Sequence, residues 1–503
     1  MAHEPPITAI GSETAPVEPT AAPPVEHPRP YAPPASTTAK GAWAERLVPI
    51  AVASALFMEF VDSTALSTAL PTLARAFHSD PVHLKLALTS YLLTLAVFAP
   101  ASGWVADRFG ARRIFLIAMG VFLAGSVLCG LSQSLGQLVA ARLVQGAGGA
   151  MMTPVGRLIV VTAAPRERFV AAMSWFTMPA LVGPLVGPTV SGLILSVASW
   201  RMIFFVNIPV AVLGAAAVAR FVPRIDRPHP GPFDLYGFVC SAVAITAIVV
   251  VSETVGMALI PPLLVAAAAV AGAVGMGLFL AHRRRTERPI LDLDLLRYPT
   301  YRASLMGGSL VRLGLGATPL LLPLLLQLGL GWSPAKAGLV TIAQTLGALA
   351  MKPVAPGLIR RFGFRLTLLS SIVAACVFTA APGLFRAGTP IVLMAAVLAV
   401  GGFVRSMHFT SANTLAYADV PQAAVSQAAT LSTVAQQVSM SLGVSFGALM
   451  LHLTRGSGGA LTVDRFTVPF LMIGLTTLLA LPLYWRLSPE AGAALAGGSR
   501  AAR

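Results

Sequence analysis

The sequence has little charge. Asp, Glu, Lys and Arg make up 11% of its 503 residues, whereas 56% are hydrophobic and the mean hydropathy is +0.78. A soluble domain contains roughly 25% charged and 45–50% apolar residues. One chain cannot hide this much apolar surface from water, so its solvent must be lipid. The net charge of +16 would indicate nucleic acid in a soluble protein, but in a membrane protein it first has to be compared with the charge bias of the loops.

The sequence also lacks the residue groups that catalysis and metal binding need. Its three cysteines, Cys129, Cys240 and Cys376, lie inside apolar runs and form neither a metal-binding set nor a disulfide framework. Neither G-x-x-x-x-G-K-[ST] nor H-E-x-x-H occurs, and the eight histidines are scattered. We therefore expect no enzyme, no metal, no cofactor, no nucleotide and no nucleic-acid partner.

Long apolar runs dominate what is present. Crossing a bilayer takes roughly 20 mostly apolar residues, which predicts fourteen spans in an all-α membrane protein. The spans are 47–70, 84–105, 113–131, 135–161, 170–195, 202–222, 234–253, 260–281, 303–327, 336–358, 366–384, 389–415, 427–452 and 467–486. Lys and Arg favour the loops after even-numbered spans by seventeen to seven. This bias predicts a multi-pass protein of a bacterial-type inner (plasma) membrane, with both termini cytoplasmic.

The two ends of the chain differ from the spans in composition. Ten prolines lie between Pro5 and Pro34, with few large apolar residues. Such a segment cannot bury a core, so we expect a disordered, Pro-rich cytoplasmic tail over 1–45 and a second disordered tail over 488–503. The first 42 residues hold no apolar run long enough for a cleavable signal peptide, so none is expected.

The chain repeats itself weakly. The segment from Gly103 to Arg113, which follows the second span, resembles the segment from Pro356 to Leu366 after the tenth, at an offset of 253. This repeat predicts two pseudo-symmetric six-helix bundles, 46–225 and 301–487, with two inserted helices and a cytoplasmic linker over 226–300. Paired halves around a site at the membrane midplane are the architecture of secondary transporters.

Five motifs in order resemble the 14-span drug:proton antiporter branch of the major facilitator superfamily. They are Asp62-x-Thr64 with Ala69-Leu70-Pro71, Gly103 to Arg113, Arg142-x-x-Gln145-Gly146-x-Gly148, Gly183-Pro184-x-x-Gly187-Pro188, and Trp200-Arg201-x-x-Phe204-Phe205-x-Asn207-x-Pro209. Ser67 stands where that branch usually has Asn. The resemblance implies a proton-coupled exporter of drugs or toxic small molecules that works by alternating access. The partners would be protons, a small-molecule substrate and the lipid bilayer, for a monomer acting alone or with an adaptor protein.

Two carboxylates lie in the middle of the first span. Glu59 and Asp62 are three residues apart, which places them on one helix face. Carboxylates in hydrocarbon are costly, so they face a cavity or pair with a base. We predict that they bind the coupled proton; the alternative is a static ion pair. The resemblance implies that Arg142 tunes the first-span carboxylate, and the alternative is a hydrogen bond to backbone carbonyls.

Two segments are predicted to act in gating. Asp107 with Arg108, Arg112 and Arg113 would form a breakable charge cluster at the inner gate, unless these charges only set topology. In the fifth span Gly183 and Gly187 permit close helix packing, and Pro184 and Pro188 remove backbone donors.

Basic residues occur within the spans of the second half. Arg312, Lys352 and Arg405 join Arg142 against two carboxylates, an excess of two positive charges. This excess suits an anionic metabolite or organic acid. The alternatives are that Arg312 pairs with Glu59 across the repeat, or that Lys352 extends towards the interface. Candidates to complete a pocket, unless they serve helix packing, are Tyr91, Gln145, His408 and Asn413. A non-transporting membrane sensor is a further alternative.

Overall fold

The computed structural model describes residues 39–163, 169–223, 231–254, 261–286, 289–421, 424–455 and 461–492. Within these ranges every regular element is a helix, which confirms the all-α prediction for the described part of the chain. The first helix begins at Ala39, inside the predicted tail. The rest of that tail, and the C-terminal tail from residue 493, lie outside the described residues.

The helices are grouped here by sequence range, as a first half (46–225), an insertion (226–300) and a second half (301–487). The first half holds α1 (Ala39–Ala76), α2 (Lys85–Phe98), α3 (Ser102–Phe109), α4 (Ala111–Leu131), α5 (Leu135–Ala163), α6 (Phe169–Val197), α7 (Met202–Phe205) and α8 (Asn207–Phe221). The insertion is α9 (Leu235–Thr254) and α10 (Pro262–Arg283). The second half holds α11 (Pro299–Gly316), α12 (Thr318–Leu324), α13 (Pro334–Ala380), α14 (Ile391–Leu415), α15 (Val425–Arg455), α16 (Thr467–Thr477) and α17 (Leu481–Trp485).

Among the described residues, eleven helical segments are long and apolar enough to cross a membrane. Predicted spans four and five correspond to α5 and α6, which are not among these eleven. Predicted span ten and all but the last four residues of span eleven lie in α13, whose backbone leaves helical geometry at Gly363 with a φ of 73°. Gly110, between α3 and α4, has a φ of 88° and lies 253 positions earlier. The repeat is therefore visible in the backbone, because both copies turn at a glycine in a region that other residues rarely adopt.

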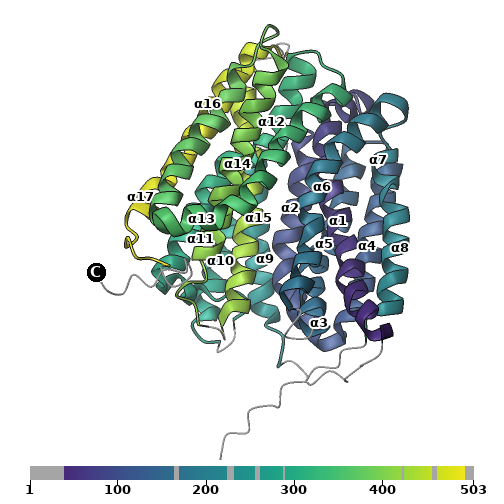
Figure 1. Ribbon diagram of the computed structural model, residues 1–503, viewed down its shortest axis with the longest axis vertical. Coiled ribbons are helices and arrows are strands. Elements are labelled where there is room, and N and C mark those ends of the chain that lie inside the picture. The colour runs from purple at the N-terminus through teal and green to yellow at the C-terminus, as the bar shows by residue number, and fades with distance from the viewer. Residues whose placement is uncertain are drawn as a thin grey trace, which may run out of the picture. The chain divides into compact units, whose positions relative to one another are not determined.

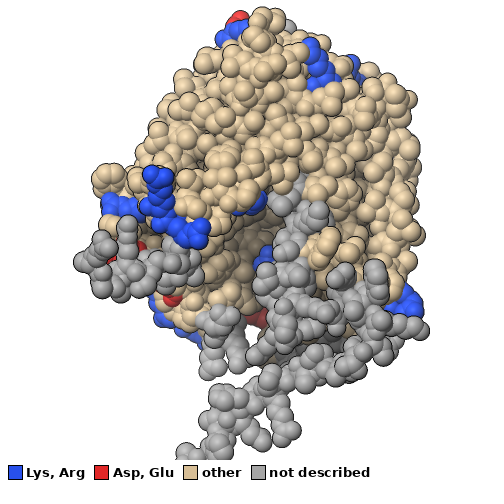
Figure 2. Space-filling view, in the orientation of Figure 1, with Lys and Arg blue, Asp and Glu red and all other residues tan. Residues whose placement is uncertain are grey.

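Charge is concentrated at two ends of the bundle. Figure 1 shows α3 at the lower end and α7 and α12 at the upper end, which we call the α3 end and the α7 end. On the face in Figure 2, a broad area below the α7 end is uncharged, as expected of a surface in contact with lipid, and Lys and Arg atoms appear again at the left edge at about half the height. The same view shows a hollow towards the α3 end with Lys or Arg atoms inside it.

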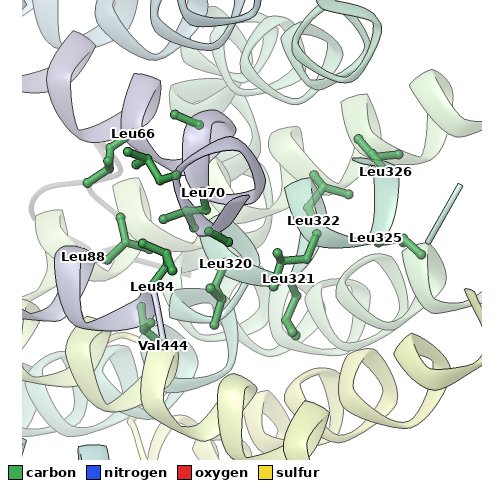
Figure 3. Close-up of a cluster of buried hydrophobic side chains, with 14 of the residues drawn as sticks. Leu66, Leu70, Leu84, Leu88, Leu320, Leu321, Leu322, Leu325, Leu326 and Val444 are labelled. Carbon is green, nitrogen blue, oxygen red and sulfur yellow. The ribbon is translucent and has the colours of Figure 1, made fainter. Parts of the chain in front are cut away.

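The buried apolar clusters show where the halves meet. One cluster, which includes Val52 and Phe122, belongs to the first half, and another, which includes Phe364 and Tyr484, belongs to the second. A third, which we call the shared cluster, contains side chains from both halves. Figure 3 shows its members Leu66, Leu70, Leu84, Leu88, Leu320, Leu321, Leu322, Leu325, Leu326 and Val444. Because it also contains Ile203 and Phe204 at α7, the halves are packed together at the α7 end.

Candidate functional site

The centre of the first half holds a buried ion pair. Asp62 on α1 and Arg142 on α5 are each 1% exposed, and Arg142 Nη1 donates to Asp62 Oδ2 at 2.5 Å. The other carboxylate oxygen, Oδ1, accepts from Gln145 Nε2 at 2.8 Å and from Asn207 Nδ2 at 3.0 Å. We call these four residues the Asp62 cluster. Three donors from two helices besides α1 hold the carboxylate, which satisfies a charge that would otherwise be costly so far from water.

Arg142 contacts both the carboxylate of Asp62 and a backbone carbonyl, the two kinds of partner considered for it. Besides the ion pair, its Nε donates to the backbone carbonyl of Ala87 on α2 at 3.1 Å, and Nη1 donates to Gln145 Oε1 at 2.7 Å. Its guanidinium lies 4.3 Å from the ring centroid of Tyr91. The predicted residues Arg142, Gln145 and Tyr91 are therefore brought together, around a cation that holds both α1 and α2.

Asn207 was not predicted as a site residue. It begins α8, is 1% exposed, and its amide also donates to Ser126 Oγ on α4 at 2.9 Å. The only signal in the sequence was an amide within an apolar stretch, in the motif that starts at Trp200. Such a group needs buried partners in a membrane, but the sequence does not say which ones.

Glu59 lies next to this cluster but is not part of it. Thr153 Oγ1 donates to Glu59 Oε2 at 3.0 Å, from α5 to α1. The side chain is half-buried, and among the described residues no base forms an ion pair with it. The Glu59–Arg312 pair considered from the repeat is therefore absent between these two described residues.

The predicted inner-gate charges lie around the turn at Gly110. Arg112 donates to the backbone carbonyl of Ala219 on α8, whereas Arg108 and Arg113 are exposed and Asp107 is half-buried. The turn thus contacts another helix of its own half through Arg112. Its role in gating stays a prediction.

The small residues of α6 lie against α1. A Cβ atom at Gly183 would lie 2.5 Å from the Cβ of Phe60, and one at Gly187 would collide with the hydroxyl of Thr64. The backbone carbonyl of Pro188 lies close to Gly338 of α13, in the other half, while the side chain of Pro184 lies outside the described part. The backbones therefore approach closely, both within the first half and between the halves.

The three basic residues predicted for the substrate site, Arg312, Lys352 and Arg405, have no acidic partners among the described residues. Arg312 donates to Asn413 Oδ1 at 3.1 Å and lies 4.9 Å from the ring centroid of Phe409. Lys352 donates to Thr410 Oγ1 at 3.2 Å. Arg405, on α14, has neither a hydrogen bond nor an ion pair with any described residue.

His408 is fully buried next to Arg312 and Phe409. Its Nδ1 lies 3.2 Å from Ser371 Oγ, and its ring meets Tyr484 edge-on with 5.7 Å between centroids. The Nε2 atom of His408 and the hydroxyl of Tyr484 are buried without a hydrogen-bond partner. Polar atoms without partners, next to bases without acids, give the second half a chemistry unlike that of the Asp62 cluster.

Lys85 was counted from the sequence as a charge in a loop, and this is wrong. It is the first residue of α2 and is 0% exposed, and its ammonium group lies 3.1 Å from the carboxylate of Glu253 on α9. The loop charge bias therefore becomes seventeen to six, which keeps its direction.

Comparison with known proteins identifies the family to which the chain is similar. The model of the Major Facilitator Superfamily matches residues 52–285 and 304–502. A protein of Pectobacterium atrosepticum is 36% identical over 87% of this chain and 95% of its own length, and one of Escherichia coli is 38% identical over 86% and 92%. Both carry the name multidrug resistance protein MdtD, which is itself provisional.

Solved structures agree on the fold. A variant of the nucleoside transporter NupG superposes with a TM-score of 0.64 at 12% identity, covering 88% of this chain and 99% of that one. A POT family transporter in complex with 5-aminolevulinic acid gives 0.65 at 16% identity, covering 88% and 96%.

Proposed function

Because the chain belongs to the major facilitator superfamily, we propose that it is a proton-coupled exporter of drugs or toxic small molecules. It is a multi-pass membrane transporter and not an enzyme. The observation that carries the proposal is the Asp62 cluster, where one buried carboxylate faces one buried base and two amides. The relatives named for multidrug resistance support the class of substrate.

In the proposed cycle, Asp62 takes a proton from one side of the membrane and releases it to the other. Protonation removes the negative charge that balances Arg142, so the hydrogen bonds of the cluster must rearrange. Arg142 also holds the carbonyl of Ala87, so this rearrangement reaches α2 as well as α1. Alternating access then follows as a shift between two arrangements of the halves that the proton stabilises differently. Glu59 and the charges around Gly110 are proposed to assist proton transfer and closure at the α3 end.

The packing of the halves supports one state of this cycle. The shared cluster joins them at the α7 end, and a smaller cluster with Ala96 of α2 and Ala428 of α15 joins them through the inserted helices further along. The hollow in Figure 2 lies towards the α3 end. The loop charges predict that the α3 end is cytoplasmic. We therefore assign the structure to an inward-open state of a monomer in a bacterial inner membrane.

Topology gives a first prediction. We propose fourteen spans, because α13 comprises two helices that meet at Gly363, and α5 and α6 cover two further predicted spans. A reporter that is active only in the cytoplasm should be active when it is fused at residue 40 and when it is fused at residue 495. A periplasmic signal from either fusion would contradict the even number of spans.

An anionic metabolite or organic acid is a second candidate substrate. The specific observation is that Arg312, Lys352 and Arg405 have no carboxylate partner among the described residues, although Arg312 is only 7% exposed. Buried cations are costly unless an anion accompanies them, and a substrate can supply it.

A substitution separates the two classes of substrate. Arg405→Ala should raise the apparent KM for an organic anion, and Arg405→Lys should restore it only in part because Lys lacks the planar fork of Arg. The assay is pH-gradient-driven uptake into inside-out proteoliposomes, with organic anions and a permanently cationic dye side by side. Arg486→Ala, an exposed position, is the matched control. If no organic anion is transported, and if Arg405→Ala leaves transport of the cationic dye unchanged, an anionic substrate is contradicted. Liposomes that transport neither class would favour a non-transporting sensor.

A further inference from the structure

A second buried ion pair joins the first half to the inserted helix α9, and it is separate from the Asp62 cluster. Lys85 Nζ lies 3.1 Å from Glu253 Oε2 and donates to the backbone carbonyl of Glu253 at 2.8 Å. The other carboxylate oxygen of Glu253 accepts from Ser445 Oγ at 2.5 Å. Glu253 is 5% and Ser445 3% exposed. We call these three residues the Lys85–Glu253 junction.

The junction connects three parts of the molecule. Lys85 lies on α2 of the first half, Glu253 near the end of the inserted helix α9, and Ser445 on α15 of the second half. Helix α9 packs against both α2 and α15. The neighbours of these side chains in sequence, Leu84 and Val444, belong to the shared cluster. The inserted helix therefore binds both halves at the seam that closes the α7 end.

Packing alone does not require charges at this position. Well-packed hydrophobic residues can replace a buried ion pair at little or no cost in stability, whereas removal of one partner is strongly destabilising. The shared cluster already supplies apolar contacts around the junction. An ion pair acts only over a short distance. If it forms in one arrangement of the halves and is broken in the other, it stabilises the first arrangement selectively.

The first turn of α2 also contacts the Asp62 cluster. The carbonyl of Ala87, two residues after Lys85, accepts the hydrogen bond from Arg142 Nε. One turn of helix is thus bound by Arg142 on one side and, through Lys85, by the inserted helix on the other. If Asp62 carries the proton, as proposed above, its protonation state can reach the junction through this turn.

We propose that Lys85 and Glu253 are positioning residues of the transport cycle, through which α9 holds the halves together at the α7 end. The pair is formed in the present state and separates when that end opens. An ion pair that does connect the two halves, Arg455 with Asp80, lies at the same end and acts in the same direction. The inserted helix α9 thereby has a role in transport, because it binds both halves whenever the α7 end is closed.

The test measures separation at the α7 end directly. Spin labels are placed at Gln133→Cys and Ala387→Cys, two exposed positions on opposite halves, after replacement of the three native cysteines. The variants are Glu253→Gln and the uncharged double variant Lys85→Met with Glu253→Gln, which leaves no buried charge alone. Both should raise the ratio of separated to closed distances by about tenfold, within the range of typical coupling between sites. Substrate transport should show a lower kcat with an unchanged KM, because the junction does not touch the proposed substrate site.

Asp294→Asn is the matched control, since it removes an ion pair with Arg283 at the end of the inserted helix α10 that does not connect the halves. It should leave the distance distribution unchanged. An unaltered distribution in the double variant, or failure of both variants to fold, would overturn the proposal and make the junction a purely structural element. Distances are measured without transport, so this result is independent of whether Asp62 carries the proton.

Discussion

Asp62→Asn is expected to abolish export driven by a pH gradient while the protein remains inserted in the membrane. Asparagine has the shape of aspartate but cannot take up and release a proton. It can keep an acceptor for one of the three donors that the carboxylate receives from Arg142, Gln145 and Asn207. The measurement is accumulation of substrate against its gradient in proteoliposomes, compared with substrate binding by the same preparation.

The main complication is the charge that the substitution leaves on Arg142, which is 1% exposed. Breaking a buried pair by removing one partner typically costs about 3–5 kcal/mol, so thermal stability must be measured before any flux is interpreted. The double variant Asp62→Asn with Arg142→Gln removes both charges and should be folded yet inactive. Glu59→Gln, which alters a half-buried carboxylate with one hydrogen bond from Thr153, should have the smaller effect. If Asp62→Asn still concentrates substrate, the proton site lies elsewhere and Glu59 is the next candidate.

Gly338→Val is expected to stop transport without unfolding the protein. A Cβ atom at this position of α13 would lie 2.5 Å from the backbone carbonyl of Pro188 on α6, and these helices belong to opposite halves. Because each half keeps its own core, the halves can move apart at this contact to relieve the overlap. The α7 end then cannot close, so turnover should fall by at least about tenfold, the effect of some 1.4 kcal/mol on a barrier or a population.

Gly347→Val is the matched comparison on the same helix. A Cβ atom there would collide with the backbone carbonyl of Ala399 on α14, within the second half. Overpacking of this kind typically costs about 1–3 kcal/mol, and no movement between the halves can relieve it. We expect lower thermal stability and less folded protein for Gly347→Val, but near-normal stability with the α7 end held open for Gly338→Val. Equal losses of stability in the two variants would refute a role for Gly338 in closure.

The sequence allowed the family and the helical fold to be predicted, because hydropathy, loop charge and the repeat are properties of the chain itself. The repeat even located the break in α13, since Gly363 lies at the same offset from Gly110 as the motifs do. The motifs also named Asp62, Arg142 and Gln145, which the structure brings within hydrogen-bonding distance. The sequence placed Arg312 opposite Glu59, but a register between repeats does not determine where a flexible side chain points. Arg312 contacts Asn413 and Phe409 instead.

Buried polar partners from distant segments were beyond the reach of the sequence. Lys85 lies at the first residue of a span, where a charge normally faces water, so the pattern favoured a loop position. Its burial depends on Glu253, 168 residues away on the inserted helix, and on Ser445 from the second half. Asn207 was missed for the same physical reason, since its role depends on the approach of α8 to α1 and α4.

The difference in charge between the halves has an electrical consequence. The first half balances Arg142 with Asp62, but Arg312, Lys352 and Arg405 in the second half have no carboxylate partner among the described residues. If one proton enters for each monovalent cation that leaves, no net charge crosses the membrane. If the substrate is a monovalent anion, two positive charges move inward per cycle. Each charge contributes about 2.3 kcal/mol per 100 mV, so the anion would be driven out by roughly 4.6 kcal/mol per 100 mV of membrane potential. If these bases bind an anionic substrate, export therefore responds to the membrane potential as well as to the pH gradient.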